Sequence, residues 1–340
     1  MDAKELEQLQ LEIRAAAAPL QLLRQEVARI VSGQKELVDR LLLALISDGH
    51  VLLEGVPGLA KTLTVKTLAQ ALDGSFSRLQ FTPDLLPADV IGTRIYNSST
   101  GEFSTKIGPV AANIVLADEI NRAPAKVQSA LLEAMQEKQL TIAGEKFALP
   151  EPFLVMATQN PIEQEGTYPL PEAQLDRFMF KLKIDYPARS EEREVIERMA
   201  HTAPPPEAVR VARLDDIMTA RALADRVYLD PKIVEYILDI VIATRPGARE
   251  NLSERQHDAD LNALSPLIAF GASPRASIAL ATGARALALL RERAYVLPQD
   301  VKDLAPDVLR HRIVLSYEAE AENIDADALI SGILENLRTP

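Results

Sequence analysis

The chain has 340 residues, 47% of them hydrophobic and 25% charged, and 37 Lys and Arg against 49 Asp and Glu give a net charge of −12. This apolar content excludes a disordered chain, and the length suggests two domains that each bury a core. Cysteine is absent, which excludes disulfide bonds, thiolate zinc sites and a cysteine nucleophile. The acidic balance disfavours a protein that coats duplex DNA or anionic membranes.

Residues 4–30 are predicted to be helical, because apolar residues recur at spacings of three and four from Leu6 onward. Residues 1–28 are therefore expected to form an N-terminal helical segment. Pro19 lies inside this pattern, and we expect it to divide the stretch into two helices, since proline removes a backbone hydrogen bond. The N-terminus lacks a signal-peptide pattern, and no apolar run approaches the ~20 residues that span a bilayer. We therefore expect a cytoplasmic protein without membrane insertion.

Residues 29–205 alternate short apolar runs with helical patterns. This alternation is typical of an α/β fold in which a parallel sheet is covered on both faces. The predicted strands are His50–Glu54, Ser77–Phe81, Asn113–Ala117, Phe153–Thr158 and Phe178–Ile184.

Residues 206–340 show no strand pattern after a linker at Pro204–Pro206. Helix-start signals recur at Asp230-Pro231, Ser273-Pro274 and Pro298–Asp300, each followed by an apolar-periodic run. We expect this second domain to be all-helical, with the mixed-charge segment Gly247–Asp260 as an exposed loop.

A glycine-containing loop directly follows the first predicted strand. Its residues are Gly55, Val56, Pro57, Gly58, Leu59, Ala60, Lys61 and Thr62. The backbone N–H groups of such a loop bind phosphate, Lys61 reaches the β- and γ-phosphates, and Thr62 can ligate Mg²⁺. Ala60 stands where glycine is usual, which is tolerable at helical dihedral angles and strained at positive φ. The alternative interpretation is an ordinary strand–turn–helix with an exposed lysine.

The third predicted strand ends in Asp118 and Glu119. Asp118 can hold Mg²⁺ through water, and Glu119 can orient and deprotonate an attacking water. By itself, an apolar run that ends in two acids usually marks a strand reaching solvent. Its separation from the phosphate loop favours a nucleoside triphosphate site instead.

Three further polar residues are candidates for work on a γ-phosphate. Asn160 follows the fourth predicted strand and could position the attacking water, although Asn160-Pro161 is also a common turn pair. Arg177 at a predicted helix end and Arg275 at a helix start could stabilise the charge of a transferring phosphoryl group. Without the other motifs, an ion pair for Arg177 and a solvated position for Arg275 are equally good interpretations.

Together these motifs resemble AAA+ ATPases of the MoxR family. The segments that carry the resemblance are Phe81–Val90, Ala117–Pro124, Ala130–Gln136, Ala157–Pro161, Pro171–Phe178 and Gly271–Ala276. Ala60 agrees with the family, whereas Ala111 stands where the family more often carries an aromatic residue. The resemblance implies a P-loop AAA+ core at 29–205 and a helical lid at 206–340, after the helical segment 1–28.

The resemblance also implies cofactors and roles. ATP and Mg²⁺ would bind at the phosphate loop, Thr62 and Asp118, with adenine near Gly33 and Gln34. Asn160 would be the sensor of the γ-phosphate, and Arg275 a sensor on the lid. Arg177 would act on the ATP of a neighbouring subunit, with Arg122 as the second choice, and such a finger implies a homo-hexamer.

Two hairpin-like inserts, Arg94–Phe103 and Leu140–Leu149, have turn residues between β-prone arms. The family places such hairpins near the pore of its ring, so we expect them to touch a substrate protein.

The segment Asp73–Ser77 matches the metal-site pattern of von Willebrand factor A domains, but its position predicts an ordinary helix-to-strand turn.

The expected function is therefore MoxR-type hydrolysis of Mg-ATP coupled to chaperone-like remodelling or maturation of client proteins. A von Willebrand factor A domain protein is the expected partner. A nucleic-acid-remodelling motor is the alternative, which the net charge of −12 disfavours. A small-molecule kinase has no place for Asn160 or for the arginine of the lid.

Overall fold

The computed structural model describes residues 3–56, 59–161, 166–186, 188–200, 206–247, 252–253, 261 and 263–340. The chain forms two compact units. The core unit comprises Pro19–Phe178 and Leu182–Met218, and the lid unit comprises Met1–Ala18, Met179–Lys181 and Thr219–Pro340. These spatial units do not follow the expected domain borders, which stay a prediction.

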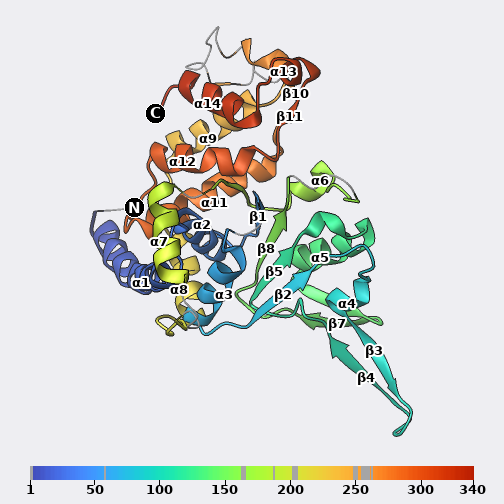
Figure 1. The fold of residues 1–340 in the computed structure, drawn as a ribbon. Helices are drawn as coiled ribbons and strands as arrows, with labels where there is room; N and C mark the ends of the chain where they lie inside the picture. Colours follow the sequence, from blue (N-terminus) through green and yellow to red (C-terminus); the bar gives the residue numbers. More distant parts are fainter. Residues whose placement is uncertain are drawn as a thin grey trace. The chain divides into compact units, whose positions relative to one another are not determined.

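A five-stranded sheet forms the centre of the α/β fold (Figure 1). Its strands, in spatial order, are β2 (Phe76–Gln80), β5 (Ile114–Asp118), β8 (Leu154–Gln159), β1 (Val51–Gly55) and β9 (Phe180–Ile184). The pairs β2–β5, β5–β8 and β8–β1 are parallel. The prediction of a parallel sheet is thus confirmed, and each strand lies within two residues of its expected bounds.

Both faces of this sheet are buried, as strands rich in aliphatic residues require. Val115 and Val155 belong to the hydrophobic cluster that includes α5 (Ala125–Glu137). Their neighbours Leu116 and Met156 are equally buried but point the other way, because successive side chains alternate along a strand. In Figure 1, α2 (Lys35–Ile46) and α3 (Lys61–Ala71) lie on the side opposite α5 and the short α4 (Pro87–Ile91).

Helix α1 runs without a break from Ala3 to Ile30, so the prediction that Pro19 divides it is wrong. Proline inside a helix costs ~3 kcal/mol. Leu9 and Ile13 before Pro19 and Leu20 and Leu23 after it are all buried. Each such side chain contributes about 1.5–3 kcal/mol on burial, so packing on both sides of the proline outweighs the lost hydrogen bond.

The two expected hairpins are present and antiparallel. The first consists of β3 (Gly92–Asn97) and β4 (Glu102–Ile107), and the second of β6 (Gln139–Ile142) and β7 (Glu145–Ala148). Ala143 and Gly144 both have positive φ, the geometry of the tight two-residue turns that match strand twist. Residues 72–75 join α3 to β2, where Ser75 Oγ donates to Asn113 Oδ1 at 2.9 Å, so the expected helix-to-strand turn is confirmed.

The lid unit is mainly helical, as expected. Its C-terminal helices are α9 (Pro231–Ala243), α11 (Pro274–Leu290), α12 (Pro298–Leu309), α13 (Tyr317–Ala321) and α14 (Ala326–Asn336), while α8 (Leu214–Ala224) begins in the core unit. The predicted helix starts are confirmed: Asp230 accepts the N–H of Lys232 at 2.9 Å, and Ser273 accepts that of Arg275 at 3.2 Å.

One feature of the lid was not predicted. After the 3-10 turn Ser265–Leu267, β10 (Ile268–Phe270) pairs antiparallel with β11 (Val314–Leu315). Strands this short show no alternation, so periodicity could not reveal them. The linker prolines Pro204 and Pro205 and most of Gly247–Asp260 lie outside the described residues. Among the described helices, none has the length and apolar character to cross a membrane.

Candidate active site

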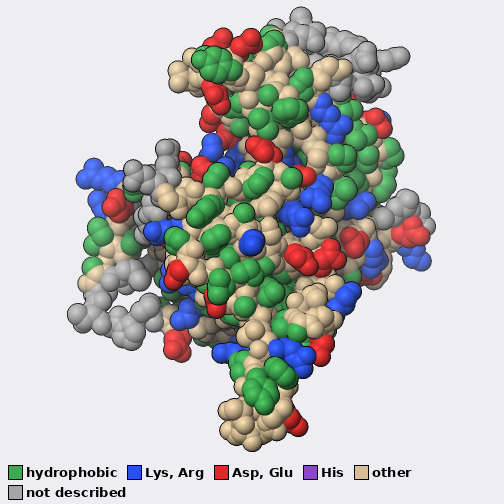
Figure 2. All heavy atoms as spheres, turned by 90° about the vertical axis from the view of Figure 1, so that its right-hand side faces the viewer, with side chains coloured by type: hydrophobic (Ala, Val, Ile, Leu, Met, Phe, Trp, Pro, Cys, Tyr) green, Lys and Arg blue, Asp and Glu red, His purple; other side chains and the backbone are tan. Residues whose placement is uncertain are grey.

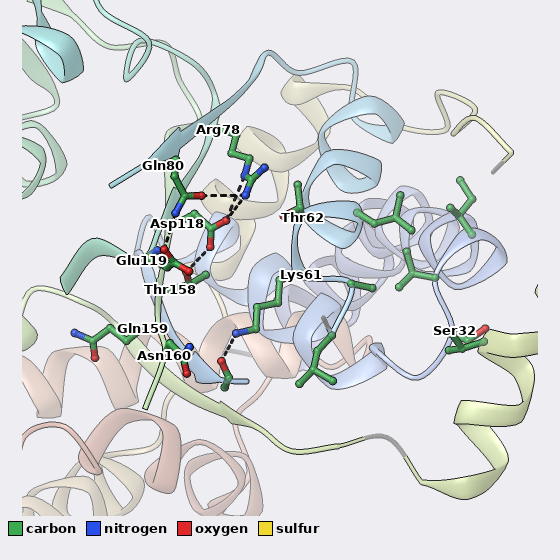
Figure 3. Close-up of a pocket in the computed structure, with 17 residues that line it drawn as sticks. Ser32, Lys61, Thr62, Arg78, Gln80, Asp118, Glu119, Thr158, Gln159 and Asn160 are labelled. Carbon is green, nitrogen blue, oxygen red and sulfur yellow. Dashed lines mark hydrogen bonds and ion pairs between the residues drawn. The ribbon is translucent and has the colours of Figure 1, made fainter. Parts of the chain in front are cut away.

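A cavity of about 620 Å³ opens in the core unit where the strands of the sheet end. Its lining includes Gly55 at the end of β1, Asp118 at the end of β5 and Asn160 just beyond β8. Ligands of parallel sheets bind outside the carboxyl ends of the strands, so this is the expected position for a site. In Figure 3, Lys61 lies between Asn160 at one end of the cavity and Ser32 at the other.

The loop between β1 and α3 lines one wall. A Cβ at Gly55 would lie 2.8 Å from the carbonyl oxygen of Ile184, so only glycine fits there. Ala60 adopts φ 53°, in the left-handed region, and is therefore strained by roughly 1–2 kcal/mol. Of the two conformations considered for Ala60, the structure therefore has the strained one with positive φ and not the helical one. Val56 and Leu59 are described, whereas Pro57 and Gly58 lie outside the described residues.

Lys61 begins α3, and its ammonium group donates to the carbonyl oxygen of Gly55. Burial lowers the pKa of Lys61, an effect that the charges of Asp118 and Glu119 oppose. A cation in a partly desolvated position gains most from a further anion. The site is therefore suited to a phosphate group. Thr62 also lines the cavity and adds a hydroxyl oxygen.

Asp118 and Glu119 are held from several sides (Figure 3). Thr158 Oγ1 donates to Asp118 Oδ1 at 2.7 Å and accepts the backbone N–H of Glu119 at 2.9 Å. Arg78 Nη2 donates to Asp118 Oδ2 at 2.7 Å. Gln80 Nε2 donates to Glu119 Oε2 at 2.7 Å. Both acids thus face the cavity with their carboxylates oriented by neutral or cationic donors.

The backbone of Glu119 is unusual, with φ 56° and ψ 50°. A left-handed residue other than glycine costs about 1–3 kcal/mol and persists where the surroundings enforce it. Here the bond from its N–H to Thr158 and the following turn Ile120–Arg122 enforce it. With this backbone conformation, the Glu119 side chain contacts Gln80 and lines the cavity.

Sequence reasoning missed Arg78, Gln80 and Thr158. Arg78 and Gln80 share one face of β2, and Gln80 is the register partner of Asp118. The missing information was the order of the strands, because only adjacency of β2 and β5 brings these residues to the acids. Thr158 precedes the predicted Asn160 by two residues and could have been found from the same strand end.

The other predicted residues have different positions. Gly33 and Gln34 directly follow Ile30–Ser32, which line the cavity, and Gln34 Nε2 donates to the Leu59 carbonyl at 3.3 Å. Arg122 Nη1 donates to Glu119 Oε2 of its own chain at 3.0 Å. Arg177 is not among the described residues that line the cavity, and its Nη1 donates to the Leu132 carbonyl at 3.1 Å. Arg275 is exposed at the start of α11, in the lid unit.

The fold and this cavity define a P-loop ATPase with a helical lid. Two family models match the chain: the ATPase family associated with various cellular activities (AAA) at residues 50–180, and the AAA lid domain at 261–333. The chain belongs to the MoxR family of AAA+ ATPases, as its relatives establish.

Chaperone MoxR1 of Mycobacterium tuberculosis is 53% identical over 315 residues, which cover 93% of this chain and 81% of that protein. YeaC of Bacillus subtilis is 46% identical over 93% of both chains. Protein MoxR of Paracoccus denitrificans is 33% identical over 92% of this chain and 93% of its own length. A solved structure of a candidate ATPase from Cytophaga hutchinsonii superposes with a TM-score of 0.89, at 46% identity and 99% coverage of both chains.

Proposed function

We propose that this ATPase couples hydrolysis of Mg-ATP to chaperone-like remodelling or maturation of client proteins. The observation that carries the proposal is that Lys61, Asp118 and Glu119 line one cavity at the carboxyl ends of the strands. A nucleic-acid motor is not favoured, because the relatives are named as MoxR proteins and a chaperone.

In this proposal Lys61 and the backbone of the phosphate loop bind the β- and γ-phosphates. Thr62 and Asp118 offer a hydroxyl and a carboxylate, the hard oxygen ligands that suit Mg²⁺, and the cation when bound would neutralise developing phosphate charge. Glu119 accepts a proton from the attacking water. Asn160 orients that water or the γ-phosphate. Adenine occupies the end of the cavity near Ser32, next to Gly33 and Gln34.

We propose that the chain forms a homo-hexamer, in which arginine side chains stabilise the negative charge that develops on the γ-phosphate. Arg177 is the proposed finger toward a neighbouring subunit's ATP, and Arg275 the proposed sensor on the lid. Arg122 is the second choice for the finger. Its bond to Glu119 within the same chain favours a local role in positioning the acid.

The β3–β4 hairpin is our proposed contact with the client. It projects at the bottom of Figure 2 with hydrophobic and basic side chains on its surface. Tyr96 and Phe103 are 55% and 60% exposed, with ring centroids 5.1 Å apart, and the Arg94 guanidinium lies 5.1 Å from the centroid of Phe103. Exposed aromatic residues of this kind are common in protein interfaces. A von Willebrand factor A domain protein is the proposed partner, and a cytoplasmic location stays a prediction.

Mixed assemblies test the active site of this proposal. Glu119→Gln should bind ATP with almost no hydrolysis, and Lys61→Ala should bind ATP poorly. Mixing Glu119→Gln with Arg177→Ala subunits should restore partial hydrolysis. At some interfaces, the intact Glu119 of one subunit then meets the intact Arg177 of its neighbour. Absence of rescue at every ratio, with both variants assembled, would reject Arg177 as a finger in trans, and ATPase stimulation by DNA would favour a nucleic-acid motor.

The hairpin contact needs a separate test. A Tyr96→Ala, Phe103→Ala variant should hydrolyse ATP normally and lose ATP-dependent binding of a purified von Willebrand factor A domain partner or client. Glu145→Ala at the start of β7 tests the second hairpin in the same assay. Unchanged binding in both variants would contradict the proposed role of the hairpins.

A further inference from the structure

The chain changes units twice within a few residues at the start of β9. Phe178 is fully buried in the hydrophobic cluster of the core unit. The next three residues, Met179–Lys181, belong to the lid unit, and Leu182 returns to the core unit. Such a short segment inside the other unit needs strong contacts there to stay ordered.

Two arginines at the end of α12 supply polar contacts. Arg310 Nη1 donates to the carbonyl oxygen of Lys181 at 2.5 Å, and Arg312 Nη1 donates to that of Met179 at 3.2 Å. Arg312 is buried and the side chain of Arg310 is only 11% exposed. Two arginines of the lid therefore hold the carbonyl groups of Met179 and Lys181, which are two residues apart, by charged donors.

Arg310 is itself fixed within the lid. Its guanidinium pairs with Asp307 at 2.6 Å and with Asp327 at 2.8 Å. Burial lowers the pKa of Arg310, but these carboxylates outweigh that effect and raise it above its ordinary value. The donor to Lys181 is consequently always charged and is held by two helices, α12 and α14.

The side chains of the segment are held as well. A Cβ at Gly283 of α11 would lie 3.2 Å from Met179 Cε and 3.5 Å from Phe180 Cζ. Glycine at this position lets both side chains approach the helix closely. The lid thus contacts the carbonyl groups of Met179 and Lys181 and the side chains of Met179 and Phe180.

One end of this segment leads to Arg177, the proposed finger, and the other leads to the phosphate loop. Arg177 precedes Met179 by two residues, and a chain of two residues spans at most about 7 Å. At the other end, the carbonyl of Ile184 lies against Gly55, where the phosphate loop begins. A displacement of Met179–Lys181 must therefore pull on Arg177, on the phosphate loop, or on both.

We propose that Arg310 and Arg312 are positioning residues that transmit the position of the lid, through Met179–Lys181, to Arg177 and to the phosphate loop. This inference rests on the role of Arg177 given under Proposed function. If ATP binding or release shifts the lid, this connection changes the position of Arg177 relative to the ATP of the neighbouring subunit. The coupling works through strand backbone and requires no contact of either arginine with nucleotide.

The test compares matched arginine variants of the lid in single-turnover ATP hydrolysis and in binding of a fluorescent ATP analogue. Arg312→Met keeps an unbranched apolar stem and removes the guanidinium donors. We expect its hydrolysis rate to fall about tenfold, within the range of allosteric couplings, while nucleotide affinity changes less than about threefold. Arg312→Lys, which retains a charged donor, should recover part of the rate.

Arg293→Met is the control, because Arg293 pairs with buried Asp300 in the lid and makes none of these contacts with β9. Its rate should stay within about twofold of the wild type at temperatures where thermal unfolding shows all variants folded. Equal losses in Arg312→Met and Arg293→Met would overturn the proposal. In that case the lower hydrolysis rate would reflect only reduced stability of the lid.

A double-variant cycle separates this proposal from the function on which it rests. On the background of Arg177→Ala, Arg312→Met should cause a much smaller further loss, because residues acting through one another are not additive. A full, multiplicative loss would reject transmission to Arg177. Wild-type hydrolysis by Arg177→Ala alone would reject the proposed finger, whereas inactive Arg177→Ala together with fully active Arg312→Met would reject only the positioning role.

Discussion

Two groups of charged side chains are made of the same residue types and differ in burial. At the cavity, the side chain of Asp118 is 19% exposed, and its partner Arg78 is 49% exposed. Inside the lid, the side chain of Asp300 is wholly buried. It accepts hydrogen bonds from Arg291 at 2.8 Å, from Arg293 at 2.5 Å and from the N–H of Leu297 at 2.8 Å.

The difference in burial determines which carboxylates can exchange their partners and which cannot. A pair that faces water is worth about 0–1 kcal/mol, so its carboxylate can exchange partners cheaply. Removing one partner from a buried pair costs about 3–5 kcal/mol, because an uncompensated charge stays behind. Asp118 and Glu119 can therefore release Arg78, Gln80 and Arg122 when a ligand enters, whereas Asp300 permanently fixes the start of α12 to the end of α11.

Glu119→Gln tests the first half of the comparison and should have the largest effect. Loss of a general base lowers a rate by about 10²–10⁴-fold, so ATP hydrolysis should become nearly undetectable. The melting temperature should be unchanged, since Gln keeps the shape and the pair with Arg122 is weak. Glu133→Gln, at an exposed position on α5, is the control and should hydrolyse ATP normally. Normal turnover in Glu119→Gln would contradict the assignment.

Asp300→Asn tests the second half. It leaves Arg291 and Arg293 without their shared buried anion, and the free energy of unfolding of the lid should fall by about 3–5 kcal/mol. Chemical denaturation followed by circular dichroism measures this loss. Asp303→Asn removes a more exposed partner of Arg291 and should cost no more than about 1 kcal/mol. Equal losses in the two variants would remove the distinction between buried and exposed pairs.

Arg78→Gln should have a smaller effect on stability. Its ion pair with Asp118 is half-exposed, so the free energy of unfolding should change by less than about 1 kcal/mol. The same denaturation experiment measures it beside Asp300→Asn. A loss as large as that of Asp300→Asn would show that the acids of the cavity are structural after all.

Glu26 on α1 is intermediate, because its carboxylate is buried while its partner Arg29 is partly exposed. The hydrogen bond from Arg29 lowers the pKa of Glu26 below 4.5, and the backbone N–H of Val209 adds to this. Its contribution to stability is therefore present above pH 4.5 and is lost as the pH falls through the lower folded-state pKa. Glu26→Gln should lack this part of the pH dependence, and stability measured at pH 6 and pH 3.5 compares the two proteins. Parallel pH profiles would exclude a depressed pKa.

The sequence alone determined the elements whose signals are local. The apolar runs predicted all five strands of the sheet, and the capping residues predicted the starts of α9 and α11. The motifs, through their resemblance to a known family, predicted the family to which the chain belongs. The strands and the helix starts depend on spacing within a few residues, which is why the sequence alone reveals them.

Tertiary structure decided what depends on neighbours distant in sequence. Packing on both sides of Pro19 keeps α1 continuous, and adjacency of β2 and β5 brings Arg78 and Gln80 to the acids. Surrounding contacts hold Ala60 and Glu119 at positive φ against their intrinsic preference. The division of β9 between two units depends on arginines more than a hundred residues away. Local rules cannot supply such information, because burial and strand order are properties of the assembled core.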